Sequence, residues 1–224
     1  MSDVVIIDYG TGNVRSVFNS LNSAISEKKV NKRVTVSDEL NVIKASSHII
    51  LPGVGSFKAC LSGLKERPGL LSVLNESVNI KMKPFLGICV GMQLLANKGF
   101  EDGEADGLGW IQGKVDILDS KNDYLKIPHI GWNNLKKVSK HPFLNFIKEN
   151  NQNEYLDDNS NAYFVHSYGF DVKLPENKIL VTDYGQEITA MVGKKNIIGT
   201  QFHPEKSQNF GQNFLTDFIL WDGK

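Results

Sequence analysis

Cysteine is scarce in this sequence. Only Cys60 and Cys89 occur among 224 residues, whereas small secreted scaffolds that depend on disulfides carry many more. A disulfide between the two would also consume the thiol of Cys89, which lies in a motif described below. We therefore expect two free thiols and a reducing compartment, and we predict a cytoplasmic protein.

An excess of either charge is also missing. The 25 basic residues balance 25 acidic ones, so the formal net charge is zero. Proteins whose main partner is nucleic acid or an anionic membrane usually show a basic excess or a basic block. No apolar run approaches the roughly 20 residues that span a bilayer, and residues 1–8 enter a strand-like stretch without a basic region or a cleavage site. We expect neither nucleic acid nor a membrane as a partner.

Internal repeats, low-complexity tracts and linker-like stretches are absent as well, which favours a single domain over residues 1–224. Apolar, β-branched runs alternate with segments of helical spacing in the first half of the chain. This alternation is typical of a doubly wound α/β fold, with a mostly parallel central sheet and flanking helices. Short strand patterns from Trp110 onward predict a smaller antiparallel region. The expected strands are 4–8, 33–37, 48–51, 85–88, 113–118, 130–135, 162–165, 178–184, 187–192 and 196–202; the expected helices are 13–25, 56–65, 70–80, 90–96 and 208–221.

One short stretch dominates the chemistry. Residues 85–88 are an apolar run typical of a buried strand and 90–96 begin a helix, so Cys89 lies on the turn between them. Glycines two residues before and after it complete a G-x-C-x-G pattern like that of a nucleophile elbow, whose strained turn exposes the nucleophile. The start of a helix favours a thiolate and aims the amide of Val90 at developing negative charge. The alternative is a structural cysteine, because free cysteine is often part of a core.

A nucleophilic cysteine needs a base, and the base needs an orienting group. Of the five histidines, His203 follows a strand-like run at 197–202 and lies two residues before Glu205. Residues two apart in an extended segment point the same way, so Glu205 can reach the imidazole. Cys89, His203 and Glu205 thus form a candidate catalytic set, although the HPE motif by itself would indicate only a surface turn.

The motifs GICVGMQ at 87–93 and HPEKS at 203–207 resemble those of the triad, or class I, glutamine amidotransferases. Within that family, DYGTGN at 8–13 and IPHIGWN at 127–133 are similar to the glutaminase subunits of imidazole glycerol phosphate synthases, which serve histidine biosynthesis. The resemblance covers essentially the whole chain in the same order, and LPGVGSF at 51–57 agrees with it, as does LGW farther along.

This resemblance implies a class I amidotransferase fold and hydrolysis of glutamine by Cys89, His203 and Glu205. It implies neither a metal nor an organic cofactor. The amides of Val54 and Val90 would form the oxyanion hole, although the loop at 52–55 could also be no more than a tight turn. The residues expected to bind glutamine are Gly53, Gln93, Glu101, His166, Ser167 and Tyr168.

The resemblance also implies a heterodimer with a cyclase subunit of (βα)8 barrel type. That subunit would use the ammonia to form imidazole glycerol phosphate and the carboxamide ribotide AICAR. The residues expected to face it are Asn13, Pro128, His129, Trp132, Asn133 and Lys206.

Several interpretations remain open at this point. A paralogous glutaminase could serve another synthase, such as one that aminates a surface-sugar precursor, and an inactive scaffold would keep the fold without the chemistry. Glu101 falls in a polar stretch, 97–107, expected to be loop, and could equally be an ordinary exposed carboxylate. The glycines of 10–12 could cradle a phosphate, but their spacing matches no phosphate-binding motif. His48 and His141 are interpreted as surface or structural residues.

Overall fold

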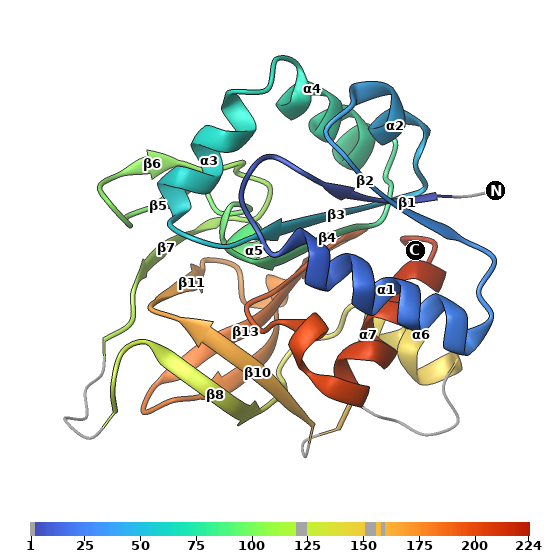
Figure 1. Cartoon of the computed structure of the whole chain (residues 1–224). Coiled ribbons are helices and arrows are strands. Elements are labelled where there is room, and N and C mark those ends of the chain that lie inside the picture. The colour runs from blue at the N-terminus through green and yellow to red at the C-terminus, as the bar shows by residue number, and fades with distance from the viewer. Residues whose placement is uncertain (1–2, 120–124, 151–155, 158–159) are drawn as a thin grey trace.

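The computed structural model describes residues 3–119, 125–150, 156–157 and 160–224. Its largest sheet has eight strands in the order β2-β1-β3-β4-β14-β13-β12-β9 (Figure 1). The strands from β2 to β14 are parallel, and the others join antiparallel. The bounds in sheet order are β2 Arg33–Ser37, β1 Asp3–Ile7, β3 His48–Gly53, β4 Phe85–Cys89, β14 Ile197–Thr200, β13 Glu187–Lys194, β12 Lys178–Asp183 and β9 Lys136–Lys137.

Two smaller sheets lie beside the large one. One joins β8 and β10 antiparallel, and the other has the order β11-β7-β5-β6. From Trp110 onward, β7, β8, β10 and β11 join β9, β12 and β13 in the antiparallel region that the short strand patterns predict, whereas the unpredicted β5 pairs with β7 in parallel. Their bounds are β5 Lys98–Gly99, β6 Ala105–Asp106, β7 Gly113–Ile117, β8 His129–Asn134, β10 Asn161–His166 and β11 Tyr168–Val172.

Helices cover both faces of the parallel strands. Figure 1 shows α2, α3 and α4 over one face and α1, α6 and α7 over the other. Strands β3 and β4 are buried along their whole length, as expected where helices cover a parallel sheet on both sides. The doubly wound α/β prediction is confirmed. The helices are α1 Val14–Lys28, α2 Leu40–Ala45, α3 Phe57–Lys65, α4 Leu70–Asn75, α5 Val90–Gln93, α6 Pro142–Asn150 and α7 Gln208–Leu220, with a π-helical turn at Glu76–Ile80 and 3₁₀ turns at Pro175–Asn177 and Pro204–Lys206.

Local details differ from the expectation in two places. The stretch 97–107 is not all loop, because β5 and β6 form within it; strands of two residues are too short for a periodic pattern. The helix expected at 90–96 is a single turn that ends at Gln93. The sequence of 141–161 also predicts a short helix followed by a polar surface run; α6 is that helix, and residues 151–155 and 158–159 of the run lie outside the described residues.

Two histidines interpreted as surface or structural are structural. His48 is 4% exposed and its Nε2 lies 2.8 Å from the carbonyl oxygen of Trp221, which ties the start of β3 to the end of the chain. His141 is equally buried, and its Nδ1 accepts the amide of Phe143 at the start of α6. Burial, together with the charge of Lys32 in the case of His48, lowers the pKa of each imidazole to about 4.

Three glycines bring β3, β4 and α5 unusually close together. A Cβ on Gly91 would overlap the carbonyl oxygen of Leu51, and one on Gly87 would overlap the backbone of Gly91. A Cβ on Gly53 would lie 2.6 Å from the amide nitrogen of Gly91. The elbow therefore depends on backbone-to-backbone packing that only glycine permits.

Gly91→Ala is expected to lower the free energy of unfolding by about 3 kcal/mol or more, because neither backbone can yield without moving a core strand. Urea denaturation measures the loss. Gly103→Ala is the control: an added Cβ there meets nothing within 4 Å, so only its positive φ opposes the change, at about 1 kcal/mol. Equal losses in the two variants would contradict the packing argument.

Candidate active site

Cys89 occupies a strained turn at the carboxyl end of β4. Its φ of 54° and ψ of −111° lie outside the usual regions for a residue with a side chain. Its thiol is free, and β4 places it in register with Gly53 of β3. This is the strand–turn–helix geometry of a nucleophile elbow. Because α5 is one turn long, its aligned peptide dipoles are few, and a neighbouring cation is the stronger means of stabilising a thiolate.

That cation is the imidazole of His203, which comes from the turn after β14. Its Nδ1 lies 2.7 Å from Glu205 Oε1, and the two side chains are 3% and 1% exposed. Burial opposes a charge on His203, but hydrogen bonding and charge interaction with Cys89 and Glu205 outweigh it and raise the pKa of the imidazole to about 10. The predicted set of Cys89, His203 and Glu205 is therefore brought together in one charged, water-poor site.

The proton on His203 gives a measurable pH dependence. Its pKa is raised above the unfolded value near 6.5, so its contribution to stability is complete below that pH and is lost as the pH rises through about 10. Titration by NMR should show this imidazole still protonated at pH 8 in the wild type. Cys89→Ala should lower the midpoint, because it removes the sulfur. A midpoint near 6.5 in the wild type would contradict the ion pair.

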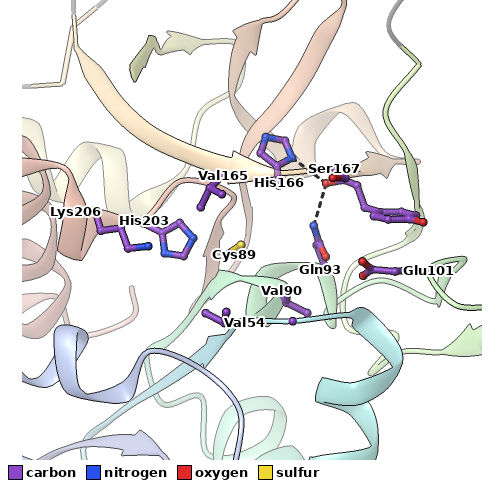
Figure 2. A pocket seen from close by; sticks show the side chains of 12 residues that line it. Val54, Cys89, Val90, Gln93, Glu101, Val165, His166, Ser167, His203 and Lys206 are labelled. Atoms are coloured by element: carbon purple, nitrogen blue, oxygen red, sulfur yellow. Dashed lines mark hydrogen bonds between the residues drawn. The ribbon is translucent and has the colours of Figure 1, made fainter. Parts of the chain in front are cut away.

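A pocket of about 150 Å³ opens beside the sulfur. Figure 2 shows His203 on one side of Cys89, with Gln93 and Glu101 on the other and Val54 and Val90 nearby. A volume of this size suits a small polar molecule. The lining residues are Val54, Gly55, Cys89, Val90, Gln93, Glu101, Val165, His166, Ser167, Tyr168, His203 and Lys206.

Polar groups line the pocket wall opposite His203. Gln93 Nε2 donates to the carbonyl oxygen of Tyr168 at 3.0 Å, and His166 Nδ1 lies 2.9 Å from the same oxygen (Figure 2). Gln93 Oε1 is buried and has no partner within the described part of the chain. Since a buried acceptor without a partner is costly, this oxygen is available to a donor on a bound molecule.

Glu101 is tied to helix α3. Its Oε2 accepts the amide of Phe57, the first residue of that helix, at 2.7 Å. Burial raises the pKa of its carboxyl group, against the effect of the Phe57 amide. The stretch that carries Glu101 is therefore fixed against the pocket, and the carboxyl group is half-buried rather than freely exposed.

The loop after β3 is held by side chains on both sides of Gly53. Tyr9 donates its hydroxyl to the carbonyl oxygen of Pro52 at 2.7 Å, and Cys60 Sγ lies 3.6 Å from the carbonyl oxygen of Val54. Gly53 packs against the backbone of α5 and is not part of the pocket lining, whereas Val54 is. The loop is thus more constrained than a simple surface turn, and the oxyanion role of the Val54 amide stays a prediction.

The residues expected to face a partner divide into two groups. Trp132 and Lys206 are exposed, and both contact the ring of Tyr163, with Lys206 also lining the pocket. Pro128 is likewise exposed. His129 is not: it is 2% exposed and stacked against the rings of Phe164 and Tyr184. Its imidazole supports β8 from inside instead of forming surface.

The other two members of that set are half-buried and bind their own chain. Asn13 Oδ1 accepts the amide of Ser16 and caps α1. Asn133 Nδ2 donates to the carbonyl oxygen of Asp183 at 2.8 Å and also lies 3.3 Å from His129 Nε2. Both side chains therefore serve structure whether or not a partner is bound.

Sequence reasoning missed three residues at the site. Val165 and Gly55 line the pocket beside predicted residues. Gln201 lies wholly buried, with Nε2 3.6 Å from Cys89 Sγ. Its signal in the sequence is its place two residues before His203, where extended backbone turns both side chains the same way.

Within residues 3–119, 125–150, 156–157 and 160–224, no three His, Cys, Asp or Glu side chains are grouped so that they could hold a metal ion. Over the same ranges, none of the helices has the length and apolar character needed to cross a bilayer.

Comparison with known proteins adds three kinds of likeness. The family model for glutamine amidotransferase class-I matches residues 5–221. The chain is 43% identical to a Brucella melitensis protein named imidazole glycerol phosphate synthase subunit HisH, over 97% of this chain and 98% of that one. A Pelagibacter ubique protein of the same name is also 43% identical, over 97% and 99%.

Solved structures show the same fold at lower sequence identity. A structure described as a glutamine amidotransferase superposes with a TM-score of 0.65 at 16% identity, over 96% of this chain and 98% of that one. A glutamine amidotransferase from Thermotoga maritima gives 0.55 at 21% identity, over 91% and 76%. At such identities the likeness concerns the arrangement of the backbone.

Proposed function

Because the chain belongs to the class-I glutamine amidotransferase family, we propose that it is the glutaminase subunit of an imidazole glycerol phosphate synthase. It hydrolyses glutamine to glutamate and ammonia and works as a heterodimer with a cyclase subunit of (βα)8 barrel type. The names of relatives that are 43% identical over nearly their full length support this assignment. Its two free thiols suit a reducing compartment, so we place the enzyme in the cytoplasm.

The chemistry follows from the positions of three side chains. The Cys89 thiolate attacks the side-chain amide carbon of glutamine, and the amides of Val54 and Val90 receive the negative charge that forms on the amide oxygen. His203 gives its proton to the departing nitrogen, which leaves as ammonia. The glutamyl group remains bound to Cys89 as a thioester. His203 then takes a proton from water, whose oxygen attacks the thioester and releases glutamate and the Cys89 thiolate. Glu205 holds the imidazole in the orientation that both steps need.

One observation carries the proposal: His203, bonded to Glu205 at 2.7 Å and with the pKa of its imidazole raised to about 10, adjoins the elbow cysteine at the edge of a small pocket. Gln93, Glu101 and the 166–168 segment line the same pocket and are proposed to hold the substrate. The unpartnered Gln93 Oε1 would accept a hydrogen bond from the substrate, and Glu101 would pair with its amino group.

The partner surface is proposed to lie beside the pocket mouth. Trp132 is 47% exposed and Ile130 is 57% exposed on β8, and exposed apolar side chains of this kind mark interaction surfaces when they adjoin one another. Lys206 connects this surface to the pocket. Ammonia released at Cys89 would pass to the cyclase, which forms imidazole glycerol phosphate and AICAR.

Purification of the chain with its bound partner, identified by mass spectrometry, tests the assignment. We expect a cyclase. With the cyclase and its ligand present, glutamine hydrolysis should rise about a hundredfold over the isolated chain, the effect of completing one oxyanion donor, because Val54 lies on a loop next to the interface. Equal rates would contradict this coupling. Capture of another synthase, such as one for surface-sugar amination, would replace the assigned pathway and leave the glutaminase chemistry in place.

A further inference from the structure

The carbonyl oxygen of Tyr168 determines which atoms of the neighbouring side chains donate hydrogen bonds and which accept them. It lies 3.0 Å from Gln93 Nε2 and 2.9 Å from His166 Nδ1, as the dashed lines in Figure 2 show. A carbonyl oxygen only accepts hydrogen bonds, so both facing nitrogens must donate. This sets the amide orientation of Gln93 and the tautomer of His166 without ambiguity.

One arm of hydrogen bonds runs from Tyr168 to the nucleophile. Gln93 Nε2 also lies 3.0 Å from the side-chain amide of Gln201. Since Gln93 donates, the facing atom of Gln201 must be its carbonyl oxygen, and its amide nitrogen is the atom 3.6 Å from Cys89 Sγ. Gln201 is wholly buried. The side-chain N–H group of Gln201 thus points at the sulfur, and Gln93, which lines the pocket, holds it in that orientation.

A second chain of hydrogen bonds runs from Tyr168 toward β8 and holds the carbonyl group of Tyr168 in place. Burial lowers the pKa of His166 to about 3 and that of His129 to about 4, so both imidazoles are neutral at pH 7. His166 Nε2 must then accept from His129 Nδ1, 3.0 Å away, and His129 Nε2 accepts from Asn133 at 3.3 Å. Every hydrogen bond in this chain has a donor and an acceptor while both imidazoles are neutral. The position of the Tyr168 carbonyl therefore does not depend on pH near neutrality.

We infer that Gln201 is a further catalytic residue: its side-chain N–H stabilises the Cys89 thiolate, while Gln93 and Tyr168 are positioning residues that orient it. The inference rests on the proposed glutaminase function. A hydrogen bond to the charged form of a group favours that form, and charge-assisted bonds in buried sites are the stronger ones. Strand register supports the placement, because Thr200 pairs with Ile88, which brings Gln201 beside Cys89.

The test measures how alkylation of Cys89 by iodoacetamide depends on pH in the isolated chain, with the Cys89 peptide quantified by mass spectrometry. Gln201→Met keeps the length of the side chain and removes the donor, so the midpoint should rise by about one pH unit. Gln201→Glu keeps an acceptor for Gln93 but places a carboxylate at the sulfur, and its midpoint should rise further. The other titratable groups near Cys89 or around its pocket are unchanged in both variants; they are His203, Glu205, His166, Glu101, Lys206, Cys60 and Tyr9.

Gln112→Met is the matched control, since Gln112 is exposed on another segment, and its profile should equal that of the wild type. Wild-type profiles in both folded Gln201 variants would overturn the inference. If the variants do not fold, the wild type still decides: the side-chain amide resonance of Gln201 should shift with the titration of Cys89, and an invariant resonance would overturn the inference. If the proposed function is wrong, the wild type will release no ammonia from glutamine. The alkylation profile does not measure that release, so this failure can be told apart from failure of the inference about Gln201.

Discussion

Replacing Cys89 by alanine is expected to lower glutamine-dependent product formation by the complex about 10⁴-fold or more, because no other group can form the thioester. Complex formation should persist, since Cys89 is 5% exposed and lines the pocket, away from the exposed side chains of β8. Added ammonium salts should support the same rate as in the wild type. Steady-state rates with glutamine and with ammonium, measured on the same preparation, check both expectations.

Cys60→Ser is the control for that experiment. Cys60 is buried and its pKa is raised mainly by burial, so it is a poor nucleophile at pH 7. A hydroxyl in its place can still donate to the carbonyl oxygen of Val54, which the thiol meets at 3.6 Å. Glutamine-dependent activity should therefore remain within about threefold of the wild type. Full activity of Cys89→Ala with glutamine, or labelling by an electrophilic glutamine analogue confined to Cys60, would contradict the mechanism.

The sequence was most informative where local patterns decide structure. β4 could be predicted because an apolar run bounded by a turn can be buried only as a strand or a helix, and a run as short as 85–88 favours the strand. The Cys89 elbow followed from its glycines. Glu205 does meet His203, but through a 3₁₀ turn at Pro204–Lys206 and not through the extended segment that the prediction assumed. The α/β class followed from the alternation of such patterns along the chain.

Contacts between distant segments could not be predicted in the same way. His48 is buried because the carbonyl oxygen of Trp221, 173 residues later, accepts from its imidazole. His129 is inside because two aromatic rings enclose it, and its neighbours on β8 alternate outward. Gln201 meets Cys89 only through the register of β14 on β4. A single sequence carries no direct signal for strand register or for the burial of a polar side chain against a remote partner.

His203→Ala is expected to lower glutamine turnover by about 10² to 10⁴, since the imidazole acts as acid in the first step and as base in the second. The effect should fall on kcat. His166→Ala should act differently, because His166 lines the pocket and bonds the carbonyl oxygen of Tyr168 rather than the sulfur. Its main effect should be a higher KM for glutamine. Rates of thioester formation in single-turnover experiments, with the cyclase present, separate the two expectations.

Glu205→Gln provides a graded variant for the same comparison. A neutral amide can still contact His203 Nδ1, but it no longer stabilises the charge on the imidazole, which Glu205 and Cys89 together hold protonated. Turnover should fall less than in His203→Ala, and the protonated fraction of His203 at pH 8 should drop. If His166→Ala abolished thioester formation while His203→Ala kept normal turnover, the roles of the two histidines would have to be exchanged. The geometry argues against that exchange, because Glu205 lies 2.7 Å from His203 and a backbone carbonyl occupies the corresponding nitrogen of His166.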